Sequence, residues 1–135
     1  MRVFLDTNVL VSAFASRGLC ADLLEEVLAE HHLVVGRNVL RELRKALREK
    51  VRLPAPRATE IADFVAREAD QVVEGAGPAR ASVNPDDALV LGEALEGRAE
   101  AFATGDGALL ELGTVQGLRI LSPRQLWETL HASET

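Results

Sequence analysis

The chain has 135 residues, 47% of them hydrophobic, with 15 Lys plus Arg against 21 Asp plus Glu and a formal net charge of -6. This length and apolar content suffice for one hydrophobic core, so we expect a single domain over residues 1–135. The only cysteine, Cys20, permits no internal disulfide, and the three histidines beside it form no zinc site of the usual spacing. The acidic balance argues against a simple basic coat for nucleic acid.

The amino-terminal segment and the lone cysteine bear on the cellular location. The sequence reaches an acid at Asp6, so it predicts no secretory leader. No apolar run approaches the roughly 20 residues that a membrane-spanning helix needs. A lone cysteine also suits a reducing compartment. We therefore expect a cytoplasmic protein without a membrane partner.

Short apolar runs typical of buried strands alternate along the chain with segments whose apolar residues recur at helical spacing. In chain order the patterns predict a strand at 3–5, a helix at 21–31, a strand at 33–35, helices at 39–51 and 58–69, and a strand at 71–73. After a Gly- and Pro-rich surface loop at 74–83, they predict a helix at 87–95, strands at 101–103 and 118–121, and a last helix capped by Ser122. This alternation predicts an α/β fold of three α/β/α layers around a central, mainly parallel sheet of about five strands.

Two acids stand where predicted strands end. Asp6 directly follows the strand at 3–5, and Asp106 follows the strand at 101–103 after Thr104 and Gly105. The carboxyl ends of parallel strands line the crevice where ligands bind, so acids from both strands can converge there. Converging carboxylates repel each other unless a cation lies between them, and Mg²⁺ or Mn²⁺ prefers such oxygen ligands. The alternative is that each acid only caps a following helix.

A third acidic position lies at the start of the helix predicted at 87–95. Asn84 and Pro85 suit the cap and the first position of a helix, and acids in the first turn favour the positive end of its dipole. Capping alone would explain this spacing, yet a helix amino terminus also receives phosphate groups. Of the two acids here, Asp87 is the better metal-ligand candidate and Asp86 is an accessory one.

Glu42 is a fourth candidate because of its angle on the helix predicted at 39–51. At about 100° per residue, the apolar residues of this helix gather on one face and the basic residues on the other. Glu42 falls on the border, from which its carboxylate can point into the crevice. The alternative is a weak pair with Lys45 three residues later.

Basic residues are concentrated in one stretch, although the chain as a whole is acidic. Residues 37–57 hold eight of the fifteen Lys and Arg, and only two acids. A net-acidic protein can still bind a polyanion through such a local surface. A solvated helix face is the alternative interpretation of the same stretch.

The acids lie in four short motifs: Leu5-Asp6-Thr7-Asn8-Val9-Leu10, Leu40-Arg41-Glu42-Leu43, Asp87-Ala88-Leu89 and Thr104-Gly105-Asp106. Together these motifs resemble the acidic signature of the PIN-domain family, and the resemblance runs from about Arg2 to the last helix. It implies a divalent-metal-dependent endoribonuclease that cleaves single-stranded RNA, often the toxin of a VapC-type toxin-antitoxin pair. It also implies a PIN-like fold.

The resemblance also implies roles for single residues. Carried over by position, it places the Mg²⁺ or Mn²⁺ ligands at Asp6, Glu42, Asp87 and Asp106, with Thr104 and Asn8 orienting ligands or water. Relatives often carry further acids where this chain has Ala88 and Ala108, so we expect one ion to be held more firmly than two.

The sequence therefore predicts hydrolysis of RNA phosphodiesters with the help of a carboxylate-bound divalent cation. Arg41, Arg44, Lys45 and Arg48 would hold the flanking RNA backbone. The expected partners are RNA, a cognate antitoxin protein and a second copy of the chain, for which exposed apolar positions at 58–69 would serve. Without the four proposed ligands, 17 acids remain against 15 bases, so the acidic excess is largely the predicted site itself.

Two other functions stay open. One is another Mg²⁺-dependent phosphoryl-transfer enzyme, although Asn8 stands where a phosphatase usually has its second Asp, and residues 121–124 lack the late lysine of a receiver domain. The other is a non-catalytic PIN-like module that binds RNA or a protein, which the alanine at position 108 keeps open.

Overall fold

A computed structural model describes residues 1–132, in which six strands form one sheet with the order β3-β2-β1-β4-β6-β5. All neighbouring strands are parallel except β5 and β6. In chain order the elements are β1 (Arg2–Leu5), α1 (Thr7–Ala15), α2 (Leu19–Glu30), β2 (His32–Gly36), α3 (Arg37–Glu49), α4 (Ala55–Glu68), β3 (Gln71–Val73), α5 (Pro85–Glu96), β4 (Ala101–Ala103), α6 (Gly107–Leu110), β5 (Thr114–Val115), β6 (Leu118–Leu121) and α7 (Pro123–His131).

All five predicted strands are present, and the prediction of an α/β fold with a mainly parallel sheet is confirmed. The sixth strand, β5, pairs with β6 across a turn at Gln116 and Gly117, whose φ angles are 49° and 87°. A strand of two residues is too short to show an apolar pattern. The sequence also does not predict α1, because apolar and small residues occupy most of its sides and leave no helical spacing.

The centre of the core lies where β1 and β4 pair. Phe4 and Phe102 are partners in the register, and their rings stack with centroids 5.3 Å apart and planes 8° apart. Both side chains are fully buried. A stacked pair contributes about 0.5–1.5 kcal/mol beyond the burial of its area. Tight packing therefore holds the two central strands side by side.

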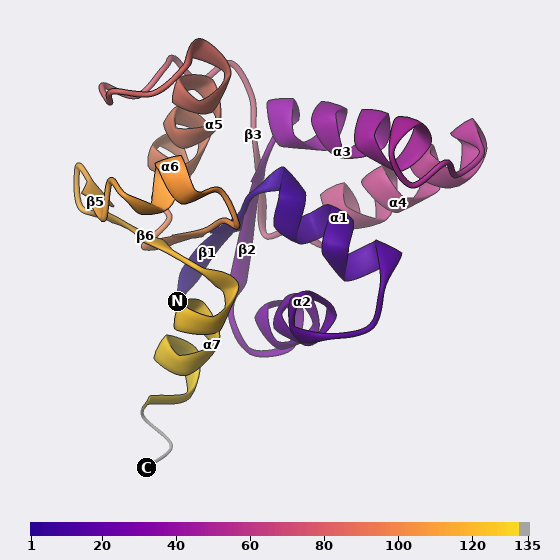
Figure 1. The fold of residues 1–135 in the computed structure, drawn as a ribbon, viewed down its shortest axis with the longest axis horizontal. Coiled ribbons are helices and arrows are strands. Elements are labelled where there is room, and N and C mark those ends of the chain that lie inside the picture. The colour runs from indigo at the N-terminus through magenta and orange to yellow at the C-terminus, as the bar shows by residue number, and fades with distance from the viewer. Residues whose placement is uncertain (133–135) are drawn as a thin grey trace.

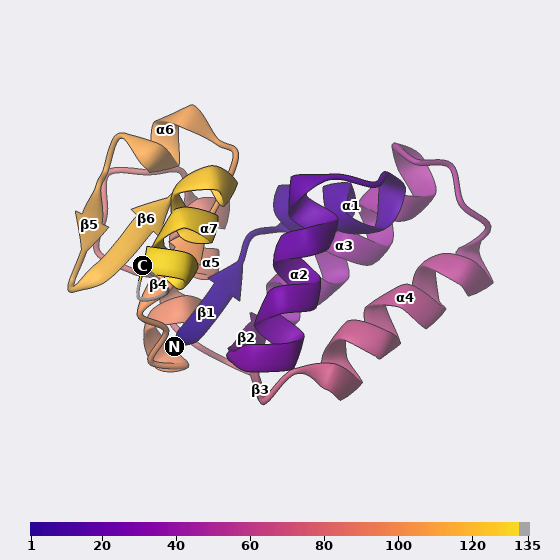
Figure 2. The same ribbon diagram turned by 90° about the horizontal axis from the view of Figure 1, so that it is seen from below.

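Helices cover both faces of the sheet. Helices α1–α4 lie on one side of β1–β3 and α5 lies on the other (Figure 1). Figure 2 shows α1–α4 together from below, with α6 and α7 next to β6, and α7 also packs against α2. Strands that are apolar on both sides require such cover, because either face would otherwise meet water.

The order of the strands reverses at β1. This strand leads through α1 and α2 to β2 on one side, whereas its other neighbour, β4, follows only after β3 and α5. The carboxyl ends of β1 and β4 therefore flank a topological switch point, where open α/β sheets usually bind ligands. Beyond the strands, the backbone N–H of Asp6 donates to the Ala103 carbonyl at 2.9 Å and keeps the two ends together.

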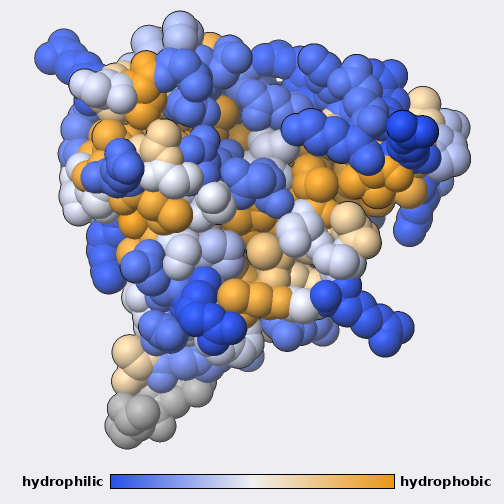
Figure 3. Space-filling model, in the orientation of Figure 1, coloured by the Kyte–Doolittle hydropathy of each residue, from blue (hydrophilic) through white to orange (hydrophobic). Residues whose placement is uncertain are grey.

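The large apolar side chains are buried or partly buried. No large hydrophobic side chain among residues 1–132 is exposed, and hydrophilic residues cover α3 on the face shown in Figure 3. The prediction of exposed apolar positions at 58–69 is therefore wrong. Ile61 and Val65 are buried because α4 packs on α3, and the half-buried Phe64 meets the ring of Phe14 edge-on at 6.2 Å. Within residues 1–132, no helix is both long and apolar enough to cross a membrane.

Candidate functional site

Five acids line one cavity of about 620 Å³ at the switch point: the four acids that the sequence singles out, and Glu49 at the end of α3, which it does not. Asp6 follows β1, Glu42 lies on α3, Asp87 lies in the first turn of α5, and Asp106 follows β4. The structure thus brings together the four acids that the sequence singles out, each from a different element.

Asp6 is the most enclosed of these acids, with a relative exposure of 8%. Its Oδ1 accepts from the backbone N–H of Thr7 at 2.8 Å, so Asp6 caps α1. Its Oδ2 accepts from the Thr104 hydroxyl at 2.7 Å and from the Asn8 amide at 3.2 Å. Burial raises the pKa of Asp6 and the charges of Asp87 and Glu42 raise it further, while the bonds from Thr104 and Thr7 act against the rise.

Thr104 and Asn8 join the end of β1 to the segment after β4. The Asn8 amide also donates to the Thr104 hydroxyl at 3.3 Å, and its Oδ1 accepts from the Gly105 N–H at 2.9 Å. The Thr104 hydroxyl in turn accepts from the Asp106 N–H at 3.0 Å. Thr104 is fully buried, so this network is shielded from water at its centre.

Glu42 is held by Thr7, which is not among the site residues that the sequence predicts. The Thr7 hydroxyl donates to Glu42 Oε2 at 2.9 Å and thereby connects α3 to the start of α1. The only feature of the sequence that points to Thr7 is its position next to Asp6. The expected alternative, a pair between Glu42 and Lys45, is not among the ion pairs within residues 1–132, and Lys45 instead lines the same cavity.

Asp87 and Asn84 form a reciprocal pair at the start of α5. The Asp87 N–H donates to Asn84 Oδ1 at 2.8 Å, and the Asn84 amide donates back to Asp87 Oδ2 at 3.0 Å. Burial raises the pKa of Asp87, the charge of Asp106 raises it further, and that of Asp86 adds to the rise, while the bond from Asn84 acts against it. Asp86 is exposed and outside the cavity lining, so it acts on the site through its charge.

Capping and cavity lining occur in the same residues. Asp6 caps α1, and Asp106 Oδ1 accepts from the Ala108 N–H at 2.9 Å and caps α6. The capping alternative is therefore correct for both acids. It does not exclude a role as metal ligands, because both carboxylates still line the cavity.

The basic residues of α3 divide between two hollows. Lys45 lines the acidic cavity, as does Lys50, which the sequence reasoning did not select. Arg41 and Arg44 line a smaller hollow between α3 and α4, and Arg48 is exposed. Of the four predicted RNA-binding residues, only Lys45 therefore lines the acidic cavity.

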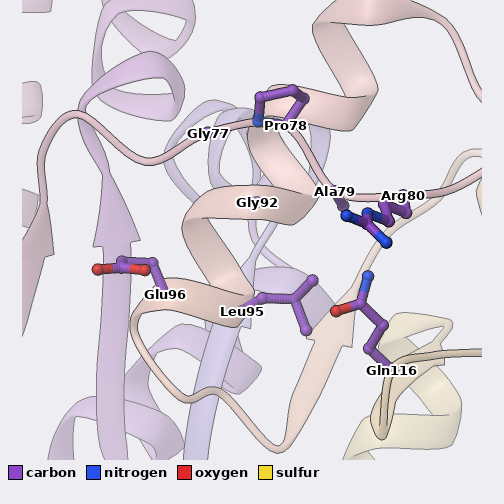
Figure 4. Close-up of a pocket in the computed structure, with 8 residues that line it drawn as sticks. All are labelled: Gly77, Pro78, Ala79, Arg80, Gly92, Leu95, Glu96 and Gln116. Carbon is purple, nitrogen blue, oxygen red and sulfur yellow. The ribbon is translucent and has the colours of Figure 1, made fainter.

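A second cavity of about 620 Å³ lies beside the carboxyl half of α5 (Figure 4). Figure 4 shows the side chains of Arg80, from the loop before α5, and Gln116, from the β5–β6 turn, pointing toward each other. The only acid in its lining is Glu96. The concentration of carboxylates belongs to the first cavity.

The donors of the acidic cavity suit a hard divalent cation. Five carboxylates lie around one space, and two of them, Asp6 and Asp87, have pKa values that are raised by burial and raised further by their neighbours' charges. A cation among them would offset that repulsion. As they stand, no three Asp, Glu, His or Cys side chains in residues 1–132 are grouped closely enough to hold one ion directly.

Comparison with known proteins bears on the family and the fold of the chain. A family model described as the PIN domain matches residues 2–108, a range that includes all four acids. Among solved structures, the chain is similar to VapBC2 from Rickettsia felis bound to a DNA fragment from their promoter, with 14% identity and a TM-score of 0.61 over 89% of this chain and 97% of that one. At this identity the likeness concerns the fold alone. No curated protein sequence matches the chain.

The raised pKa of Asp87 predicts how the stability of the metal-free protein changes with pH. The folded protein binds this proton more tightly than the unfolded chain, whose ordinary pKa is 3.8. The resulting stabilisation is complete below that value and is lost as the pH rises through the raised pKa. The Asp87→Asn variant cannot titrate at this position, and its amide oxygen can still accept from Asn84.

We therefore expect the unfolding free energy of Asp87→Asn, measured with urea in the presence of a chelator, to gain on that of the wild type between about pH 4 and about pH 7. If the difference between the two unfolding free energies is the same at both pH values, or if the wild type gains on the variant as the pH rises, the folded state does not disfavour the ionised form of Asp87.

Proposed function

The chain belongs to the PIN-domain family, and from that premise we propose that it is a divalent-metal-dependent endoribonuclease that cleaves single-stranded RNA. The observation that carries the proposal is the convergence of Asp6, Glu42, Asp87 and Asp106 on one cavity. Capping can account for acids one at a time, but it does not account for five carboxylates around one space. Lys45 and Lys50 in the same lining add the positive charge that a phosphate backbone requires.

In this proposal each residue has a separate task. Asp6, fixed by three donors, would be the central ligand of the ion, with Glu42, Asp87 and Asp106 around it. Thr104 and Asn8 would keep Asp6 oriented. A bound Mg²⁺ or Mn²⁺ would make a water more acidic for in-line attack and offset charge on the phosphate. Lys45 would hold the phosphate next to the bond that is cleaved, while Arg41, Arg44 and Arg48 would contact more distant backbone.

The number of ions follows from the residues around the acids. Ala108 is exposed and adjoins the segment of Asp106, and Ala88 is buried next to Asp87. Neither position supplies an oxygen from its side chain for a second ion. We therefore propose that one ion is held firmly, with Asp86 acting as an accessory charge.

The expected partners complete the proposal. The similar Rickettsia felis structure is a complex of VapBC2 with promoter DNA, which supports a toxin role with a cognate antitoxin. A homodimer, a cytoplasmic location and a single domain over residues 1–135 belong to the same proposal. A small neighbouring gene that encodes a DNA-binding protein would support the antitoxin directly.

Asp6→Asn should abolish Mn²⁺-stimulated cleavage of single-stranded RNA while leaving the fold intact. The amide removes the negative charge and presents a donor to the ion, so we expect the Kd for Mn²⁺ to rise more than about 100-fold, beyond the range for residues that only support ligands. Calorimetric titration, a cleavage assay and circular dichroism measure the three quantities.

Asp22→Asn is the matched control, because it removes the same charge from an exposed position on α2, outside the cavity. It should retain both Mn²⁺ binding and cleavage. Undiminished cleavage by purified Asp6→Asn would contradict the proposal. Absence of Mn²⁺ binding in the wild type would instead support a non-catalytic module.

Lys45→Ala should weaken RNA binding by the loss of one phosphate contact. The slope of log affinity against log salt should become shallower by about 1. Arg57→Ala removes a cation from the same basic stretch. Arg57 lies outside the cavity lining and forms an ion pair with Glu60 at 3.1 Å, so the salt slope of this variant should equal that of the wild type. Fluorescence anisotropy with a non-cleavable RNA, measured over a range of salt, gives both slopes. Equal slopes for the two variants would rule out Lys45 as a specific phosphate contact.

A further inference from the structure

Glu93 on α5 is a buried acid that the proposed chemistry does not use. Its relative exposure is 1%, although carboxylates are almost never fully buried without a partner. It lies nearly two turns after Asp87 on the same helix. Nothing in the sequence marks it, since it falls within an otherwise ordinary helical pattern.

The partners of Glu93 lie at the start of another helix. Its Oε2 accepts from the backbone N–H of Asn38 at 2.9 Å and from the Asn38 side-chain amide at 3.2 Å. Burial raises the pKa of Glu93, the hydrogen bonds from Asn38 and the backbone N–H of Val39 act against the rise, and the charge of Glu42 adds to it. Glu93 therefore accepts from the first backbone donors of α3 and stands close enough to Glu42 to be affected by its charge.

Helix α3 needs this partner because it has no cap of its own. The residue before it is Gly36, which has no side chain that could accept from the first turn. Unpaired N–H groups at a buried helix start are costly, and a carboxylate there also complements the helix dipole. Glu93 supplies from α5 the cap that α3 lacks.

Gly36 is also the residue that makes room for the carboxylate. A Cβ at this position would stand 2.0 Å from Cδ of Glu93 and 2.1 Å from its Oε1. The φ angle of Gly36 is -111°, which other residues adopt easily, so space and not backbone conformation requires the glycine here. Oε1 of Glu93 has no hydrogen-bond partner among residues 1–132, so the bonds of this side chain go to α3 through Oε2.

Helix α5 is fixed on its other side as well. A Cβ at Gly92 would lie 1.9 Å from the Gly77 carbonyl, so the helix and the loop before it are in direct backbone contact. Figure 4 shows Gly77 and Gly92 next to each other at this contact. Successive residues of α5 thus attach it to its own loop and, through Glu93, to α3.

We propose that Glu93 is a positioning residue for the acidic cavity: by capping α3 from α5, its carboxylate sets the helix that carries Glu42 relative to the helix that carries Asp87. Two of the four proposed ligands reach the cavity from these two helices. The inference rests on the proposed metal-dependent function, since the distance that Glu93 controls matters only if both acids serve one ion.

The test compares Mn²⁺ binding in Glu93→Ala, Glu93→Gln and the wild type. Glu93→Ala removes the acceptor, and its Kd for Mn²⁺ should rise about 10-fold or more, as for other residues that support metal ligands. Glu93→Gln keeps one carbonyl oxygen for Asn38 and should bind Mn²⁺ like the wild type. In RNA cleavage, kcat of Glu93→Ala should fall while KM for RNA stays unchanged. Glu96→Ala is the control, because it removes an exposed acid from the same helix.

A second pair of variants separates packing from capping. Gly36→Ala alone forces the carboxylate away from α3 and should both destabilise the protein and weaken Mn²⁺ binding. In the double variant Gly36→Ala with Glu93→Ala, the new methyl group fills the space that the carboxylate leaves, so thermal stability should recover. Mn²⁺ affinity should not recover, because the cap is still missing. This double variant also keeps the test valid if Glu93→Ala alone fails to fold.

The outcomes distinguish this inference from the function on which it rests. If the wild type binds no Mn²⁺, both fail. If the wild type binds Mn²⁺ and Glu93→Ala or the folded double variant binds it equally well, only the role of Glu93 is overturned. A loss in Glu93→Gln as large as in Glu93→Ala would also overturn it, because the acceptor would then not be what matters.

Discussion

The rest of the site depends on a carboxylate held out of water between the two central strands. Asp6 is nearly buried, and three donors from Thr7, Asn8 and Thr104 fix both of its oxygens. Those donors belong to segments that follow β1 and β4, so the position of Asp6 depends directly on the pairing of these strands. The stacked rings of Phe4 and Phe102 beneath it stabilise that pairing.

The other acids approach Asp6 at a cost in electrostatic energy. Burial raises the pKa of Asp6 and of Asp87, and the charges of neighbouring acids raise both further, so the metal-free fold tolerates repulsion at this edge of the sheet. The fold offsets the repulsion with hydrogen bonds to each acid: Thr7 donates to Glu42, Asn84 to Asp87 and Ala108 to Asp106. Such an arrangement is poor for stability alone and useful for binding a cation. The net charge of -6 is consistent with this interpretation, since five of the acids gather here.

The sequence predicts the acids at the ends of strands better than the residues that link one helix to another. Asp6 and Asp106 are predictable because an acid after an apolar strand of a parallel sheet has only one edge to occupy. Thr7 and Glu93 are not predictable in this way, because the role of each depends on a partner in another helix. The spacing of residues within one helix does not reveal such a partner. Gly36 is similar, since its missing side chain matters only through Glu93. The prediction that α4 exposes apolar side chains is wrong for a similar reason, because the pattern within one helix does not show which other helix packs against it.

The central claim is that the four acids hold one divalent cation, and a crystal structure with bound Mn²⁺ tests it most directly. Anomalous diffraction from Mn²⁺ locates the ion without reference to any assumed ligand. The account predicts one strong peak within the cavity, with oxygens of Asp6, Glu42, Asp87 and Asp106 or their bound waters around it. A peak elsewhere on the molecule, or none at a concentration that saturates binding in solution, would contradict it.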